Sequence, residues 1–153
     1  MFRRLVPLLL APLLGSCQPP EILVHAVFLG NALAFVPADG DDSALCWKEG
    51  LVVDDSLKPS WRFTAAGTGE CRSLFPLFYG RPPADADDSE AARSLEPGRL
   101  YLFEGNVIGP VSGAFSLSRA GRGLIVHNVD PHSPAAAALR ERWWARRYAA
   151  PAR

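Results

Sequence analysis

The sequence has no excess of charge of either sign. Its 153 residues carry 16 basic and 16 acidic side chains, which gives a formal net charge of zero. Nucleic-acid affinity comes mostly from Lys and Arg side chains that neutralise phosphates, so this balance argues against a nucleic-acid partner. Apolar residues are not scarce: they make up 48% of the chain, which is too many for a disordered protein. The length favours a single domain.

Long apolar runs are also missing. The run at residues 5–14 contains two prolines and has about half the length that a membrane-spanning helix needs. Arg3 and Arg4 precede this run, and small residues follow it. A basic start, a short apolar run and small residues together indicate a secretory signal peptide.

The segment Leu14-Gly15-Ser16-Cys17 closes this signal-like region. It resembles the lipobox of bacterial lipoproteins, which are cleaved immediately before the cysteine. The resemblance implies that residues 1–16 are removed and that Cys17 carries a diacylglyceryl group on its thiol and a further acyl chain on its amine. Residues 17–20 would then form a lipidated tether, and two or more chains anchor a protein stably. The alternative is an ordinary secretory signal with an incidental cysteine.

Residue 18 bears on which membrane such an anchor would enter. In the enterobacterial sorting rule, an aspartate after the lipidated cysteine retains the protein in the inner membrane, and this chain has Gln18 there. The resemblance therefore implies the outer membrane of the bacterial cell envelope, with the protein facing the periplasm.

Charge is unevenly distributed in the expected mature chain. Acidic side chains concentrate between residues 39 and 55 and between residues 85 and 96, whereas arginines dominate from residue 140 onward. Runs of one sign commonly belong to solvated loops and helix faces, and we interpret these runs in that way.

Cysteine is scarce, with three in the chain. If Cys17 takes the lipid, Cys46 and Cys71 remain, and an oxidising compartment favours a disulfide between them. Closing a loop of this length stabilises a fold by roughly 3.5 kcal/mol in the chain-entropy description. Two alternatives stay open: a redox pair, which is more often spaced C-x-x-C, and a metal site, which needs further ligands.

Short strand-like segments fill most of residues 21–130. They alternate apolar and polar residues or are rich in β-branched and aromatic residues, and turn-forming residues separate them. We expect a long mobile loop at residues 80–96, with a short helix near 88–93. This pattern favours an all-β domain, an antiparallel sandwich or barrel of seven or eight strands, over a βαβ fold. A hairpin turn is expected at Gly30-Asn31. In the segment 98–104, Leu100 and Leu102 are expected on one face and Tyr101 and Phe103 on the other. The segments expected as strands are 21–28, 32–36, 44–47 with 50–53, 59–64, 71–79, 98–104, 113–118 and 123–129.

A seven-residue segment narrows this choice. Leu95-Glu96-Pro97-Gly98-Arg99-Leu100-Tyr101 resembles the L-x-P-G-x-x-Y segment of fibronectin type III domains. The resemblance implies an immunoglobulin-like antiparallel β-sandwich in which Leu95 plugs one end and Tyr101 forms a corner, with its hydroxyl bonded to backbone upstream. The chain lacks other clear marks of that family and has an extra hairpin after Tyr101.

The last segment predicts a C-terminal α-helix over residues 133–148. Ser133 is a good N-cap, Pro134 is a favoured first helical residue, and residues of high helix propensity follow. The helix is expected to extend to about Tyr148.

Arginines surround the two adjacent tryptophans of this expected helix. Residues four apart are neighbours, which brings Arg140 beside Trp144 and Trp143 beside Arg147. Two interpretations stay open. One tryptophan docks the helix onto the β domain, or the helix is a basic, tryptophan-bearing surface for anionic lipid or a partner.

Candidate catalytic and metal-binding groups do not form a convincing constellation. His127, Asp130 and His132 are close in the sequence, but Pro131 separates them, and no metal-ligand or triad spacing is met. The acidic run at residues 39–43 could supply calcium ligands, but it lacks the rest of an EF-hand loop. We therefore expect no enzyme, no metal and no cofactor.

The expected function is that of a lipid-anchored cell-envelope protein that serves as a protein-interaction or structural module. One alternative is a periplasmic module that binds carbohydrate or another small ligand through exposed aromatic residues. A second alternative is a hydrolase without a recognisable motif. The aromatic candidates for ligand binding are Trp47, Trp61, Phe78 and Tyr79.

Overall fold

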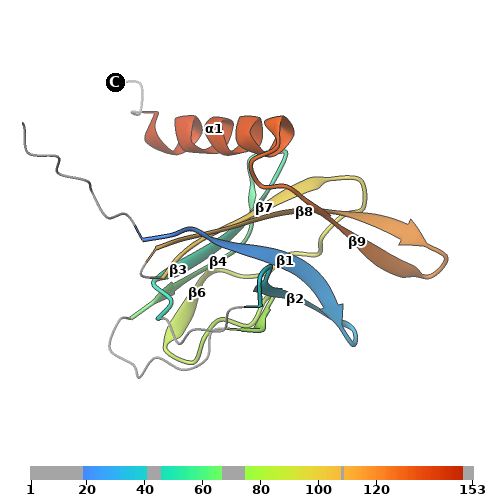
Figure 1. The fold of residues 1–153 in the computed structure, drawn as a ribbon, viewed down its shortest axis with the longest axis horizontal. Coiled ribbons are helices and arrows are strands. Elements are labelled where there is room, and N and C mark those ends of the chain that lie inside the picture. Colours follow the sequence, from blue (N-terminus) through green and yellow to red (C-terminus); the bar gives the residue numbers. More distant parts are fainter. Residues whose placement is uncertain (1–18, 41–45, 67–74, 108, 150–153) are drawn as a thin grey trace, which may run out of the picture.

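The computed structural model describes residues 19–40, 46–66, 75–107 and 109–149. They form nine β-strands and one α-helix (Figure 1). The prediction of a β-rich chain with a C-terminal helix is confirmed. The strands are β1 (Ile22–Leu29), β2 (Ala32–Pro37), β3 (Glu49–Asp54), β4 (Pro59–Ala65), β5 (Leu77–Phe78), β6 (Ala86–Glu90), β7 (Leu100–Asn106), β8 (Pro110–Ala120) and β9 (Gly123–Val129), and the helix is α1 (Pro134–Tyr148).

The strands join into one curled, mixed sheet, and the expected two-sheet sandwich is not confirmed. Hydrogen bonding gives the strand order β5-β2-β1-β8-β7-β3-β4-β6, with β9 paired to β8 as a branch. β1 and β8 run parallel and pair Ile22 with Val111, so the expectation of a purely antiparallel arrangement is wrong. The other strand pairs in the described ranges are antiparallel.

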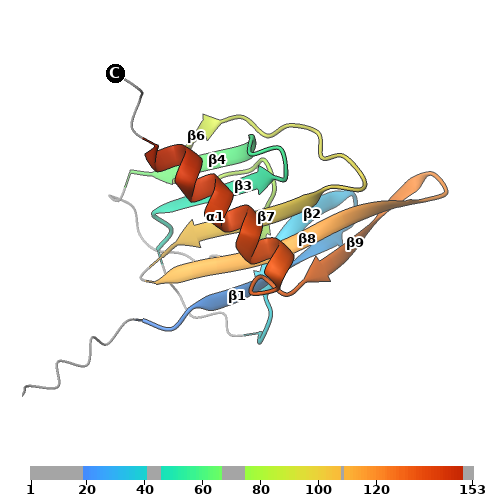
Figure 2. The same cartoon turned by 90° about the horizontal axis from the view of Figure 1, so that it is seen from above.

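Side chains alternate between two cores, one on each face of the sheet. We call the face enclosed by the curl the inner face and the face that carries α1 the outer face (Figure 2). On β7, Tyr101 and Phe103 belong to the inner core and Leu102 to the outer core, which is the separation that the sequence predicts. The largest fully buried inner side chains are Phe35, Trp61, Phe63, Tyr101, Phe103 and Phe115.

Aromatic rings interlock in the inner core. The rings of Phe35 and Phe103 stack with centroids 4.4 Å apart, and those of Tyr101 and Phe115 stack at 5.2 Å. Such pairs add about 0.5–1.5 kcal/mol each beyond the burial of their surface. These pairs therefore stabilise the inner core beyond the contribution of its buried surface.

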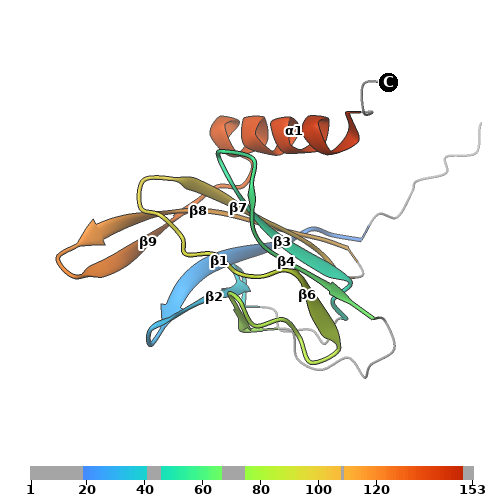
Figure 3. The ribbon, with the colours of Figure 1, turned by 180° about the vertical axis from the view of Figure 1, so that it is seen from behind.

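Two short hairpins project from the same end of the molecule (Figures 1 and 3). The β1–β2 hairpin turns at Gly30-Asn31, as the sequence predicts, and Gly30 has φ +62°. The β8–β9 hairpin turns at Gly121-Arg122, with Gly121 at φ +60°. A positive φ at the first of two turn residues is typical of a type II′ turn, which suits glycine.

The segment expected as a loop with a helix near residues 88–93 instead contains strand β6. It pairs antiparallel with β4, and no helix lies in that described stretch. Asp88 accepts a hydrogen bond from Trp61 Nε1 at 2.7 Å. The acidic composition of β6 has low strand propensity, but pairing with the edge of β4 overrides it. Of the strand expected at 71–79, β5 covers only Leu77–Phe78, and residues 71–74 lie outside the described ranges.

Helix α1 begins where the sequence predicts. Ser133 caps it by accepting a hydrogen bond from the amide of Ala136 at 3.4 Å. Ala136, Leu139 and Trp143, spaced by three and four residues, form its buried face. The helix lies across β3, β7 and β8 on the outer face (Figure 2). In the part of the chain that the structure describes, no helix is long and apolar enough to span a membrane.

Candidate functional site

The structure divides the four helix residues predicted for a partner or membrane surface into two pairs. Trp143 is 8% exposed and packs in the outer core, and Arg140 turns toward β7. Trp144 is partly buried, while Arg147 is exposed and holds its guanidinium 5.6 Å from the centroid of the Trp144 ring. Trp143 therefore docks the helix, and Trp144 and Arg147 lie at the surface.

Arg140 joins α1 to β7 through a mostly buried ion pair. Its Nε donates to Glu104 Oε1 at 2.7 Å and its Nη1 donates to Pro131 O at 3.1 Å. The Arg140 side chain is 22% exposed and that of Glu104 is 17% exposed. Burial raises the pKa of Glu104 although Arg140 opposes the shift. This pair is part of the docking interface and is unavailable as a surface charge.

A groove of about 460 Å³ lies between the C-terminal half of α1 and the outer face of the sheet. Trp144 and Arg147 line the helix side, and Glu49 and Leu51 of β3 line the opposite side. Pro19, the first described residue, also lines it. A side chain at Gly109 would lie 3.1 Å from Pro19, so the glycine leaves room for the incoming chain.

The exposed end of α1 includes three residues beyond the four predicted for a partner or membrane surface. Arg142 and Arg146 are exposed, and Tyr148 is 74% exposed with its ring stacked on Trp144 at a centroid distance of 5.6 Å. The sequence did contain a signal for them. The spacing of Ala136, Leu139 and Trp143 marks the buried face and thereby leaves these arginines on the solvent side.

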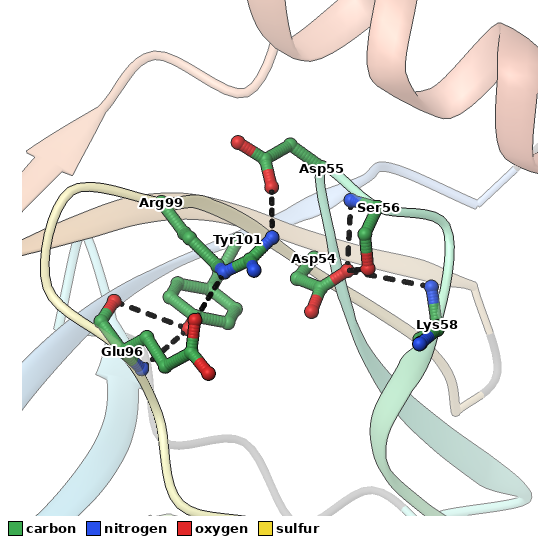
Figure 4. Close-up of polar contacts among 7 residues, drawn as sticks. All are labelled: Asp54, Asp55, Ser56, Lys58, Glu96, Arg99 and Tyr101. Atoms are coloured by element: carbon green, nitrogen blue, oxygen red, sulfur yellow. Dashed lines mark hydrogen bonds and ion pairs between the residues drawn. The ribbon is translucent and has the colours of Figure 1, made fainter.

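Tyr101 makes the corner contact that its sequence segment suggests (Figure 4). Its hydroxyl accepts a hydrogen bond from Glu96 N at 2.7 Å and donates to Glu96 O at 3.2 Å. Leu95 packs against the inner core. Arg99 then bridges Glu96, at 2.6 Å, and Asp55 of the β3–β4 turn, at 3.0 Å. These contacts fix the position of the segment that leads into β7. The resemblance to fibronectin type III domains stays a prediction.

The β3–β4 turn contacts α1 on the side of the helix that faces the sheet. Asp54 Oδ1 accepts hydrogen bonds from Ser56 and, at 3.4 Å, from the amide of Lys58 (Figure 4). Leu57 has φ +61°, a conformation that costs a non-glycine residue about 1–3 kcal/mol. Its side chain packs in the outer core, and its carbonyl accepts from Arg146 Nη1 at 3.4 Å. The turn thus supports the C-terminal end of the helix.

The histidines near the start of α1 contact separate partners. His127 Nε2 lies 2.7 Å from Ser118 Oγ, whereas His132 Nε2 lies 2.9 Å from Glu21 Oε2. Asp130 accepts from the backbone amide of His132. Among the described residues, no group of three His, Cys, Asp or Glu side chains could hold a metal. Most of the acidic run considered for calcium, residues 41–43, lies outside the described ranges.

The aromatics considered for carbohydrate binding form no exposed platform. Trp47 is 3% exposed and Trp61 is fully buried, both in the inner core. Tyr79 donates its hydroxyl toward the carbonyls of Ser60 and Arg93, each at 2.8 Å. The expectation that the tryptophans are exposed for a ligand is therefore wrong, because the curl of the sheet encloses them. Phe78 and Tyr79 are partly exposed, and the guanidinium of Arg81 lies 5.7 Å from the centroid of the Phe78 ring.

The expected lipidation site and half of the expected disulfide lie outside the described residues. These are Cys17 and Cys71, so both expectations stay predictions. Comparisons with protein-family models, with curated proteins and with solved structures found no match to this chain.

Proposed function

We propose that this protein is a lipid-anchored interaction module of the bacterial cell envelope and that its outer face is turned toward the membrane. The position of Pro19 carries the proposal. This residue follows the predicted lipidation site, Cys17, by two positions and lines the same groove as Trp144 and Arg147. A chain spans at most about 3.6 Å per residue, so the lipid would attach within about 7 Å of Pro19, on the α1 side of the sheet.

The exposed side chains of α1 support this orientation. Arg142, Arg146 and Arg147 are exposed, with Tyr148 beside them. Each basic side chain near the membrane surface is attracted to anionic headgroups by roughly 1 kcal/mol. Aromatic side chains such as Tyr148 favour the membrane interface. A lipid together with a basic surface is a two-signal anchor of the kind that holds a protein stably on a membrane.

The other end of the molecule would then be free for interaction. The β1–β2 and β8–β9 hairpins project from the end opposite the β7–β8 turn and the last turn of α1 (Figures 1 and 2). With α1 against the bilayer, these hairpins would extend sideways from the anchor point into the periplasm. A Cys46–Cys71 disulfide remains part of the proposal, since the periplasm is an oxidising compartment that favours it.

The anchor is tested on the full-length protein from membrane fractions. Mass spectrometry should find Cys17 as an acylated N-terminal residue, and Cys17→Ala should move the protein to the soluble fraction. An intact N-terminus, or wild-type protein found only in the soluble fraction, would contradict the anchor.

The orientation is tested with the non-lipidated Cys17→Ala protein and vesicles of anionic lipid. Arg146→Gln with Arg147→Gln removes two charges from α1 and should weaken binding by about 2 kcal/mol, or about thirtyfold, an effect that salt should reduce. Arg119→Gln with Arg122→Gln is the matched control, because both arginines are exposed on the β8–β9 hairpin. Equal binding by the two double variants would contradict the proposed orientation. It would not affect the conclusion drawn from the acylation of Cys17.

The groove favours a second candidate function, the binding of a small ligand. The groove has a volume of about 460 Å³. Trp144 and Arg147 line its helix side, and Glu49 and Asn106 line its sheet side. An aromatic wall with charges of both signs suits a small amphipathic ligand with a cationic group directed to Glu49. Addition of such a ligand should change the tryptophan fluorescence of the wild type and not that of Trp144→Leu; identical responses would exclude the groove.

A further inference from the structure

The edge of the sheet along β9 lacks the protection that the other outer strands have. In the described part of the chain, β8 is the only strand that pairs with β9. β5 has only two residues, and β6 carries Asp87, Asp88 and Glu90. The sequence of β9, GLIVHNV, has no acidic or basic residue apart from His127, and no proline. Native proteins usually shorten, charge or cover such an edge to prevent pairing with another chain.

The unprotected part of this edge is residues 123–127. At Asn128 the side-chain amide accepts from Ala26 N at 2.7 Å and donates to Ala26 O at 2.9 Å, so β1 lies beside β9 there. Beyond that point the hairpin projects from the body of the molecule (Figure 3). It exposes Leu124 at 38% and Ile125 at 46%. Successive strand residues point to opposite faces, so both faces of this ribbon present an apolar side chain.

The hairpin register fixes which backbone groups point outward. The turn has two residues, so the flanking Ala120 and Gly123 form a hydrogen-bonded pair. Such pairs recur at every second residue, which makes Ser118 and Ile125 the next one. The N–H and C=O groups of Leu124 and Val126 consequently point away from β8, toward the open edge.

We propose that a second copy of this chain pairs antiparallel with β9 about a two-fold axis at Ile125. In this register Leu124 exchanges two backbone hydrogen bonds with Val126 of the second copy, and Val126 does the same with its Leu124. The two Ile125 side chains face each other at a non-hydrogen-bonded position, where Cβ atoms lie about 4.5–5.5 Å apart.

Charge and symmetry both favour a second copy as the occupant. Arg122, at the turn, comes opposite Asn128 of the other copy, so no like charges meet across the axis. The axis is perpendicular to the sheet, and the same surface serves both copies, as a two-fold interface requires. Both α1 helices then lie on the same face of the extended sheet, which agrees with the proposed membrane side. The pairing itself does not depend on the lipid anchor.

A cysteine at the axis tests the register in the full-length protein. Ile125→Cys places two thiols across the two-fold axis at a separation that a disulfide spans. Mild oxidation should give a band at twice the monomer mass that disappears with reductant. Leu124→Cys is the matched control, since Leu124 is also exposed, at 38%, on the same strand but faces Val126 of the other copy. The wild type, oxidised in the same way, shows how much dimer forms through the native cysteines.

A proline on the open edge provides the second arm. Val126→Pro removes an outward N–H that β8 does not use. It also removes part of a side chain that packs against the inner core, so thermal unfolding is measured in parallel to establish that the variant is folded. Combined with Ile125→Cys, it should reduce the crosslinked dimer at least fivefold. The proposal is overturned if Ile125→Cys gives no dimer, if Leu124→Cys crosslinks equally well, or if the dimer survives Val126→Pro. A crosslink from Ile125→Cys to a different protein would also overturn it, in favour of a foreign strand.

Discussion

Replacing Arg140 by methionine should destabilise the protein by about 3 kcal/mol at pH 7.5. The substitution removes the 2.7 Å bond to Glu104 and leaves that carboxylate, only 17% exposed, without its charged partner. Breaking a buried pair from one side costs about 3–5 kcal/mol, and the slight exposure of both side chains places this pair at the low end. Urea unfolding followed by tryptophan fluorescence measures the difference.

The double variant Glu104→Met with Arg140→Met isolates the charge. Both sites then hold apolar side chains of similar volume between β7 and α1, and buried ion pairs replaced in this way are commonly neutral or more stable. We expect the double variant to lie within about 1 kcal/mol of the wild type. A double variant as unstable as Arg140→Met would show that lost packing, and not the unpaired charge, causes the effect.

The pH dependence has a definite sign. Burial raises the folded-state pKa of Glu104 above its ordinary value of 4.5, and Arg140 is the main influence that lowers it. Removing Arg140 raises this pKa further. The unpaired carboxylate therefore destabilises the folded state fully at pH values above its folded-state pKa, and the destabilisation decreases as the pH falls and the carboxyl takes up a proton. The deficit of Arg140→Met should therefore shrink between pH 7.5 and 4.5. A deficit below 1 kcal/mol at pH 7.5, or one that does not change with pH, would refute the reasoning.

Two further predictions concern the β domain. Tyr101→Phe removes the acceptor of the Glu96 amide and should lower the free energy of unfolding in urea by about 1–3 kcal/mol. A change under about 0.5 kcal/mol would show that the corner contact does not stabilise the fold. Thiol labelling of the denatured mature protein should find Cys46 and Cys71 blocked until reductant is added; free thiols without reductant would rule out the disulfide between them.

The features that the sequence predicted correctly are local ones. Ser133 and Pro134 mark the helix start because capping depends only on adjacent residues. Gly30 marks the β1–β2 turn for the same reason, since a positive φ is a property of one residue. The contact of Tyr101 with Glu96 spans five residues and was likewise visible in a short segment.

The features that it did not predict depend on distant neighbours. Strand β6 forms because β4 offers it an edge and Trp61 offers Asp88 a donor, neither of which is visible in its own acidic sequence. The same holds for Arg140, whose role is set by Glu104 on β7. Of the four α1 residues predicted for a partner or membrane surface, the structure uses Trp143 and Arg140 to dock the helix, which depends on contacts that the segment alone does not show.

The parallel pairing of β1 with β8 has a consequence for how the chain folds. β1 is the first strand among the described residues, yet it lies between β2 and β8, and its contact with β8 joins residues about 90 positions apart. Contacts at such separation form slowly, because the intervening chain must close a long loop first. As the chain emerges N-terminus first, the β1–β2 hairpin therefore has an open edge until Val111 and Ser112 follow. That interval is when the nascent sheet is most exposed to pairing with the wrong strand.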